Sequence, residues 1–198
     1  MLNNLNSIDN SNPVKVWDPL VRLFHWGLVL AFFIAYITEE DFLSIHTFAG
    51  YSIIALISFR LVWGFIGSPY ARFSNFIYPT SIIKQFIQDT FSFKAKRYIG
   101  HNPAGGLMII LLIASLLLCT ISGIAVYGAE DHAGPMALWF THSDGLWGKL
   151  FEEIHEFFAN FIIFLIIVHL FGVIVESMIH KENLVKSMIN GWKSGEDR

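Results

Sequence analysis

Charged side chains are scarce in this sequence. Only 15% of its 198 residues are Asp, Glu, Lys or Arg, whereas 54% are hydrophobic. A water-soluble domain of this size usually carries about 25% charged residues. The shortage of charge therefore argues against a soluble protein and predicts a chain that crosses a membrane several times.

Cysteine is nearly absent. The one cysteine, Cys119, lies inside an apolar run. A single thiol cannot form an intrachain disulfide, a multi-thiolate metal site or the two-cysteine attachment of a covalent haem. Any metal or cofactor must therefore be held by other side chains, among which the eight histidines stand out.

Long apolar runs make up most of the chain, and four of them are long enough to cross a bilayer. They cover residues 20–37, 44–66, 105–127 and 153–179. We predict an all-α fold, an up-down-up-down bundle of four membrane helices over residues 20–180. A flexible tail (1–19) precedes it and a second tail (181–198) follows it. The segment 67–104 is predicted to contain an amphipathic surface helix near 80–90, and 128–152 is predicted to be a loop.

Basic residues gather on one side of the predicted bundle. Side A consists of both tails and segment 67–104, and holds 12 of the 13 Lys and Arg residues, with Arg22 and Arg60 counted near that face. Side B consists of 38–45, 128–152 and the first turn of the fourth run, and its one base is Lys149. Side B also holds nine acids: Glu39, Glu40, Asp41, Glu130, Asp131, Asp144, Glu152, Glu153 and Glu156. The positive-inside rule places side A in the cytoplasm, which predicts a multi-pass membrane protein with both termini cytoplasmic.

The fourth run carries two histidines, His155 and His169. They are 14 residues apart, so on a helix they leave within about 40° of each other and lie about 21 Å apart along the axis. The alternating direction of the runs places His46 at the depth of His155, and His25 at the depth of His169. Two facing imidazoles at one depth suit axial ligation of a b-type haem. The pattern thus predicts two haems, with ligand pairs His46/His155 and His25/His169.

Other interpretations of these histidines are weaker. One histidine in a membrane span is often a buried hydrogen-bonding residue or part of a proton path, and a transporter with a proton relay would explain each singly. Zinc needs three or four converging ligands, whereas each depth offers two. Pairing of all four by depth favours haem.

Glycines offer room for a large flat ligand. Gly105 and Gly123 are 18 residues apart, five whole helical turns, so they share a face and lie near opposite ends of the third run. Gly50 follows His46 by four residues. We expect these glycines to let a macrocycle approach the backbone, although small residues also serve simple helix packing in membranes.

Two arginines are candidate partners of a haem carboxylate. Arg60 lies 14 residues beyond His46, on the same face but near side A, and Arg22 precedes His25 by one turn. Alternatively, Arg22 anchors its helix at the membrane interface. The remaining histidines, His101, His132, His142 and His180, are expected to be solvated. His101, with Asn102 and the aromatic stretch 70–78, is also a candidate for a quinone site.

Several stretches resemble the bacterial cytochrome b561 family, which includes the cytochrome b subunit of nickel–iron hydrogenases. They are VWDPLVRLFHW, IHTFAGY, FRLVWGFIGSPYARFSNF, RYIGHNPAGGLM and IHEFFANFIIFLIIVHLFG, within about residues 14–192. The resemblance implies a four-helix bundle with two b haems in the bacterial inner membrane, whose ligands match His25, His46, His155 and His169. It also implies electron transfer between quinone and a partner at the outer face, or superoxide oxidation by a stand-alone enzyme.

We expect an electron-transfer subunit more than a stand-alone enzyme, and assign no catalytic residue. Side B, with nine acids and one lysine, would repel superoxide and attract a cationic partner. That partner would be a c-type cytochrome or the catalytic subunit of a dehydrogenase or hydrogenase, docking at the loop with Trp139, Phe140 and Trp147. The alternative is a superoxide:quinone oxidoreductase. Quinone and membrane lipid are the other expected partners, and no nucleic acid is expected.

Overall fold

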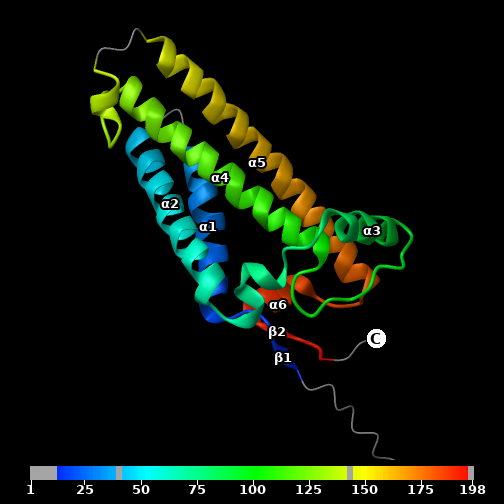
Figure 1. Cartoon of the computed structure of the whole chain (residues 1–198). Coiled ribbons are helices and arrows are strands. Elements are labelled where there is room, and N and C mark those ends of the chain that lie inside the picture. Colours follow the sequence, from blue (N-terminus) through cyan, green and yellow to red (C-terminus); the bar gives the residue numbers. More distant parts are fainter. Residues whose placement is uncertain (1–12, 39–41, 142–144, 196–198) are drawn as a thin grey trace, which may run out of the picture.

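A computed structural model describes residues 13–38, 42–141 and 145–195. Four of its helices are long and apolar enough to cross a membrane. They are α1 (Pro19–Ile37), α2 (Leu43–Ile66), α4 (Pro103–Ala129) and α5 (Leu146–Ile179). Figure 1 shows them as one elongated bundle. The prediction of an all-α bundle with four membrane helices is confirmed.

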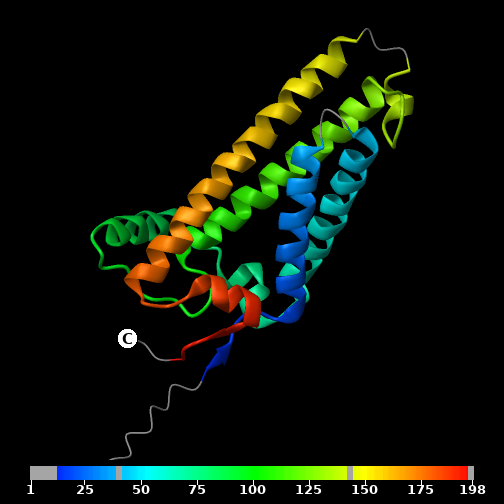
Figure 2. The ribbon, with the colours of Figure 1, turned by 180° about the vertical axis from the view of Figure 1, so that it is seen from behind.

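The four helices form two pairs. Helix α1 packs on α2, and α4 packs on α5, while α2 also touches α4. Both views show the pairs close together at the end near residues 130–145 and apart at the other end, where α6 (Leu184–Asn190) lies (Figures 1 and 2). A core of fully buried aliphatic side chains joins the pairs, with Ile57 of α2 and Ile162 of α5 among the least exposed. The two helix pairs are therefore further apart at side A than at side B (Figures 1 and 2).

Short capping motifs set where α1 and α4 begin. Asp18 Oδ1 accepts hydrogen bonds from the amides of Leu20 and Val21 (2.9 and 3.0 Å), and Pro19 occupies the first helical position. Asn102 Oδ1 accepts from the amide of Gly105 (2.6 Å) at the start of α4. An Asx residue followed by proline is a favoured helix start, so both membrane helices begin where the backbone needs a polar partner.

The N-terminal residues differ from the predicted flexible tail. Strand β1 (Val14–Lys15) pairs antiparallel with β2 (Trp192–Lys193). Val16 and Trp17 are buried, and their amides donate to the carbonyl of Gly191 (2.9 and 3.1 Å). The two strands are far apart in sequence, so their pairing leaves no local signal. Residues 1–12 lie outside the described part of the chain.

Residues 184–195 are also structured. The C-terminal segment (residues 184–195) holds α6 and β2, and it touches the start of α1 and the segment 67–104. Trp17 Nε1 donates to Ser187 Oγ (3.3 Å), and Trp26 Nε1 donates to the carbonyl of Met188 (3.4 Å). The tail predicted for 181–198 therefore ties the two helix pairs together at side A.

An ion-pair network holds the C-terminal segment to the segment 67–104. Glu182 pairs with Arg97 (3.0 Å) and with Lys193 (3.4 Å). Lys193 Nζ also donates to the carbonyl of Tyr98 (3.3 Å). Burial would raise the pKa of Glu182, but the hydrogen bond from Arg97 and the two positive charges outweigh it and lower the pKa. The carboxylate therefore remains ionised and the network persists at neutral pH.

One further helix agrees with the sequence prediction, and another is longer than predicted. The amphipathic helix expected near 80–90 is α3 (Thr80–Phe91). Helix α5 begins at Leu146, inside the segment 128–152 that was predicted to be a loop. The residue before it, Gly145, is the N-cap and adopts a left-handed conformation (φ 73°). The short 3-10 turns are η1 (Pro69–Ala71), η2 (Phe73–Asn75) and η3 (Ala137–Trp139).

Candidate functional site

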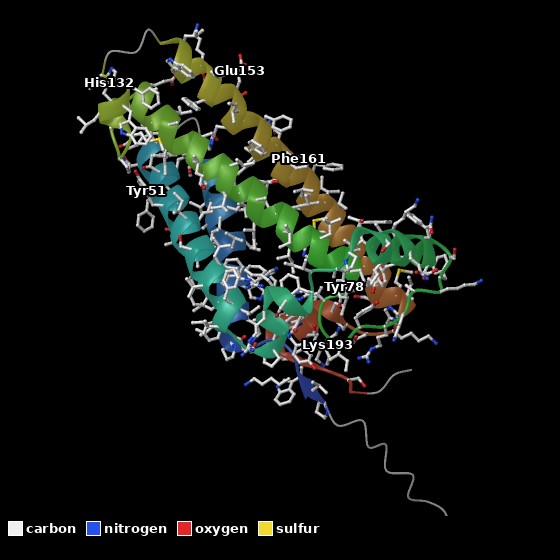
Figure 3. The ribbon with its side chains drawn as sticks, viewed as in Figure 1. Tyr51, Tyr78, His132, Glu153, Phe161 and Lys193 are labelled. Atoms are coloured by element: carbon white, nitrogen blue, oxygen red, sulfur yellow. The ribbon has the colours of Figure 1, made fainter. Side chains whose placement is uncertain are left out.

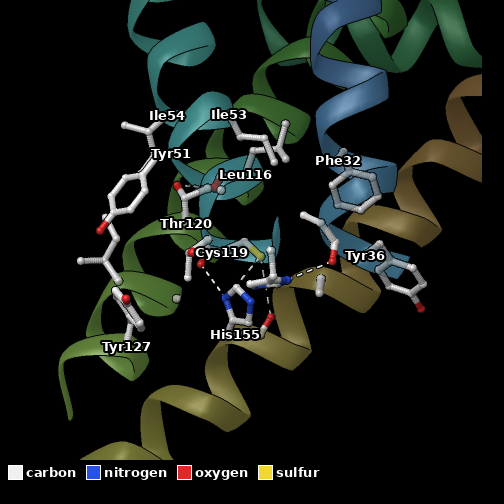
Figure 4. A pocket seen from close by; sticks show the side chains of 17 residues that line it. Phe32, Tyr36, Tyr51, Ile53, Ile54, Leu116, Cys119, Thr120, Tyr127 and His155 are labelled. Atoms are coloured by element: carbon white, nitrogen blue, oxygen red, sulfur yellow. Dashed lines mark hydrogen bonds between the residues drawn. The ribbon is translucent and has the colours of Figure 1, made fainter. Parts of the chain in front are cut away.

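His46 and His155 face each other near side B. His46 lies in the first turn of α2 and His155 in the third turn of α5, and their ring centres are 5.9 Å apart with the planes at 76°. Figure 4 shows His155 projecting into a pocket lined by residues from α1, α2, α4 and α5. We call these two residues the outer pair. The depth argument predicted that they would meet, and the structure brings them together.

Backbone carbonyls orient both rings of the outer pair. His46 Nδ1 lies 2.9 Å from the carbonyl oxygen of Ala35, and His155 Nδ1 lies 2.7 Å from that of Cys119. A carbonyl oxygen can only accept, so each Nδ1 carries the proton and donates. Each Nε2 then has a free lone pair, which is the arrangement that metal-binding histidines usually show.

The spacing of the outer pair fits an iron atom between the rings. A metal–imidazole bond is about 2 Å long, so two such bonds in line hold the ring centres roughly 6 Å apart. The pocket around the pair is partly open to the surroundings. Its wall is largely apolar and includes Phe32, Tyr36 and Tyr127. The residues present therefore suit a flat, apolar ligand with a central metal.

Gly123 supports the outer pair through its missing side chain. A Cβ atom at this position would lie 2.8 Å from Cε1 and 3.0 Å from Nδ1 of His155. Gly123 and Gly50 both line the pocket, and a Cβ atom at Gly50 would meet no protein atom within 4 Å. Gly105 lies instead at the start of α4, where its amide donates to the capping Asn102.

Sequence reasoning missed the acceptors of the outer pair. Ala35 and Cys119 act through backbone carbonyls, which every residue carries, so no residue type marks them. The Cys119 thiol is also close, with Sγ 3.6 Å from His155 Nδ1. Only the spatial approach of α1 to α2 and of α4 to α5 reveals these contacts.

The inner pair, His25 and His169, is arranged differently. The two side chains are close enough for their charges to interact, but the ring contacts found among the described residues do not include this pair. His25 Nδ1 is buried without a hydrogen-bond partner among those residues. Helices α1 and α5, which carry these two residues, diverge toward side A (Figure 2).

Arg60 is buried near the inner pair. Only 3% of its surface is exposed. Its Cζ lies 4.8 Å from the ring centre of Phe73 and 5.8 Å from that of Phe76, and its Nη1 has no hydrogen-bond partner among the described residues. Arg22 differs, because its Nη1 donates to the carbonyl of Ile189 while its buried Nε has no such partner. Arg22 therefore also fastens the C-terminal segment.

His101 is not the solvated residue that was expected. Its ring lies between Trp17 (4.5 Å between centres) and Phe76 (4.6 Å), and its Nδ1 is buried without a partner among the described residues. Burial, together with the positive charges of Arg60, Lys193 and His169, lowers its pKa to about 3. The ring is therefore neutral at physiological pH. Its aromatic neighbours come from distant segments, which is why sequence reasoning placed it in solvent.

Two further described histidines belong to neither pair. His132 is exposed, with a positive φ of 51°. His180 Nε2 lies 3.4 Å from a carboxylate oxygen of Glu176. His142 lies outside the described residues.

Side B presents acidic and aromatic side chains. Figure 3 shows Glu153 and His132 at this end of the bundle and Lys193 at the opposite end. Trp139 and Trp147 are exposed, whereas Phe140 is half-buried against Phe151. The exposed acids of the described residues are Glu130, Asp131, Glu152, Glu153 and Glu156. The predicted acids Glu39, Glu40, Asp41 and Asp144 lie outside the described residues.

Comparison with known proteins agrees with this geometry. A family model described as prokaryotic cytochrome b561 matches residues 16–191. The chain is similar to the probable Ni/Fe-hydrogenase B-type cytochrome subunits of Azotobacter vinelandii, Rhodobacter capsulatus and Cupriavidus necator. Identities are 23%, 22% and 24%, over 93%, 98% and 92% of this chain and 90%, 86% and 87% of the relatives. The chain therefore belongs to the prokaryotic cytochrome b561 family and is a membrane b-type cytochrome that binds haem b and transfers electrons.

Proposed function

We propose that this chain binds two b haems and carries electrons between a redox protein outside the cytoplasm and quinone in the inner membrane. The observation that carries the proposal is the outer pair, with ring centres 5.9 Å apart and both Nδ1 atoms engaged by backbone carbonyls. The inner pair, His25 and His169, is proposed as the ligand set of the second haem. Its support is the matching depth of the two residues and their electrostatic interaction.

When bound, haem b supplies a one-electron iron couple inside the bilayer. The residues of this chain would position the haem and control which molecules can reach it. Ala35 and Cys119 hold the outer imidazoles in the tautomer that leaves Nε2 free. Gly123 makes room for the His155 ring, and the largely apolar wall of the pocket limits water. The spacing between the pairs, about 21 Å along α5, lets electrons cross most of the membrane.

The partner is proposed to dock at side B. The exposed acids around the start of α5 favour a cationic surface, and Trp139 and Trp147 offer exposed apolar contact. The relatives are named as subunits of nickel–iron hydrogenase. We therefore propose the catalytic side of a hydrogenase or related dehydrogenase as partner, with a basic c-type cytochrome as the alternative. Side A and both termini are placed in the cytoplasm on the positive-inside rule.

The experiment is a haem count joined to a quinone assay. Purified protein is expected to contain two haems per chain, to show a reduced-minus-oxidised b-haem spectrum, and to pass electrons to a quinone analogue after reduction. His132→Ala is the control, because this exposed histidine belongs to neither pair. One haem per chain would contradict the two-haem proposal. A haem-free protein would point instead to the proton-relay interpretation.

A further inference from the structure

Several buried side-chain nitrogen atoms at side A lack hydrogen-bond partners among the described residues, including Nε of Arg22 and Nδ1 of His25. Two others come from neighbouring segments, Nη1 of Arg60 and Nδ1 of His101. Leaving a buried donor unpaired costs about 1–3 kcal/mol, and more for a charged group. Native proteins rarely leave such atoms unpaired unless a bound group or water meets them. These atoms therefore call for a ligand.

Arg60 and His101 approach the same aromatic ring from different segments. Arg60 Cζ lies 5.8 Å from the ring centre of Phe76, and the His101 ring centre lies 4.6 Å from it. The charge of Arg60 also acts on His101. The two unpaired atoms thus belong to one neighbourhood, formed by α2 and the segment that leads into α4.

Arg60 and His101 lie at the depth of the inner pair. Arg60 is within two turns of the end of α2, and His101 precedes the start of α4 by two residues. Both helix ends lie at side A, where α1 begins before His25 and α5 ends after His169. A ligand of Arg60 and His101 is therefore at the end of the bundle that holds the proposed inner haem.

No carboxylate among the described residues forms a salt bridge with Arg60. The charge of Asp18 acts on Arg60 without a direct contact, since Asp18 Oδ1 caps α1 and Oδ2 accepts from Trp63 (3.2 Å) and Ser68 (2.6 Å). A buried guanidinium without a directly paired carboxylate and with an unpaired N–H is unfavourable.

We propose that Arg60 and His101 together bind a carboxylate of the inner haem, Arg60 as its counter-charge and His101 as a second donor. This inference rests on the proposed two-haem function. An ionised carboxylate has enough lone pairs for both donors and forms its strongest hydrogen bonds with a guanidinium. A quinone carbonyl is neutral and would leave the buried charge of Arg60 uncompensated. His101 is thereby reassigned from a candidate quinone residue to a haem-positioning residue.

The test is a redox titration of both haems in the purified holoprotein, with the inner haem assigned from the His46→Ala variant that retains it. Arg60→Gln removes a positive charge that stabilises the reduced iron. We expect this substitution to lower the equilibrium constant for reduction of the inner haem roughly tenfold. For one electron this is a fall of about 59 mV in the reduction potential. Arg60→Lys keeps the charge and is expected to shift the reduction potential of the inner haem less than Arg60→Gln does.

His101 is tested by a matched pair of substitutions. His101→Leu removes the donor and is expected to shift the inner potential in the same direction as Arg60→Gln, by less. His101→Asn places an amide N–H near the position of Nδ1 and is expected to restore the wild-type value. His180→Asn is the control, since this side-A imidazole lies beside Glu176 (3.4 Å) and outside the Arg60–His101 neighbourhood, and it should change neither potential.

Two outcomes would overturn the assignment. One is an inner potential that stays at the wild-type value in both Arg60→Gln and His101→Leu. The other is a His101→Leu protein whose KM for quinone rises while its potentials stay fixed, which would return His101 to a quinone site. If a variant loses the inner haem and keeps the outer one, the loss itself supports the assignment. If one of Arg60→Gln and His101→Leu does not fold, the other decides, and an unmoved inner potential in that variant overturns the proposal. A wild-type protein with fewer than two haems would instead contradict the proposed function.

Discussion

Two backbone carbonyls and one glycine determine the geometry of the outer pair. The carbonyls of Ala35 and Cys119 hold the rings of His46 and His155 by their Nδ1 atoms, and Gly123 leaves space beside the His155 ring. Ligand orientation of this kind commonly matters as much as ligand identity, because it fixes tautomer and basicity. At the residue scale, the site therefore depends on positions that carry no ligand atom.

Gly123→Ala is expected to damage the outer site selectively. The new Cβ atom would lie 2.8 Å from His155 Cε1, so the ring must move. Such overpacking typically costs about 1–3 kcal/mol, and we expect the outer haem content to fall several-fold while the inner haem stays. The measurement is haem content per chain with spectral assignment. Gly27→Ala is the control, since its Cβ would meet Leu56 at an ordinary 3.6 Å, and equal haem loss in both variants would contradict the explanation.

Asp18 gives the fold a pH dependence. Burial would raise its pKa, but hydrogen bonds from Ser68, Trp63 and the amides of Val21 and Leu20 prevail and lower it below the ordinary value. A lowered pKa in the folded state means that the ionised group stabilises the fold above the unfolded pKa, near 3.9. That stabilisation is lost as the pH falls through the folded pKa.

Asp18→Asn tests this dependence, because it keeps an oxygen for capping but removes the charge. We expect a lower melting temperature at pH 7 by about 2–4 °C, the equivalent of roughly 1 kcal/mol. The difference from the wild type should shrink as the pH falls below 4. Thermal unfolding in detergent at several pH values is the measurement. A difference that is constant over that range would contradict a role for the carboxylate charge.

The C-terminal segment is the element that closes side A. It holds α1 through Trp17 and Trp26 and the segment 67–104 through Lys193, at the end where the helix pairs diverge. It therefore sets the spacing available to the inner pair. The outer pair is held directly by packing between helices and does not need it.

Truncation after Asn183 is expected to release the inner haem and leave the outer one. The cause is the loss of the contacts that join the helix pairs at side A. Haem content per chain and the redox spectrum measure the result, and truncation after Gly195 is the control. Equal retention of both haems would show that the C-terminal segment is not required for the inner site.

The sequence predicts elements well where one physical signal dominates. Apolar length predicted the four membrane helices, and the 3.6-residue period predicted α3. Depth along alternating helices predicted that His46 would meet His155. The β1–β2 pairing and the burial of His101 between Trp17 and Phe76 depend on contacts between distant segments. No local pattern encodes such contacts, so they emerge only from the fold.

At the scale of the whole molecule, charge separates the two ends of the bundle. The exposed acids near the start of α5 face one base, Lys149, on side B of the described residues. Electrostatic steering by such a surface raises the association rate of a cation and falls steeply with salt. It also repels anions. The polarity of the molecule thus favours a basic redox partner over superoxide.

Ionic strength tests this polarity. We expect the rate of electron exchange with a basic c-type cytochrome to fall about tenfold between low and physiological salt, as followed by stopped-flow absorbance. Superoxide consumption by the isolated protein with quinone present should be slow. Rapid superoxide turnover with little salt dependence toward the cytochrome would favour the superoxide:quinone oxidoreductase.

The most direct test of the two-haem account is a haem count in single histidine variants. His46→Ala and His155→Ala should each lose the same haem, and His25→Ala and His169→Ala should each lose the other. Optical redox titration distinguishes the haem that remains in each protein. The account predicts one haem per chain in all four variants, identical within a pair and different between pairs. A His25→Ala protein that lost the same haem as His46→Ala would contradict it.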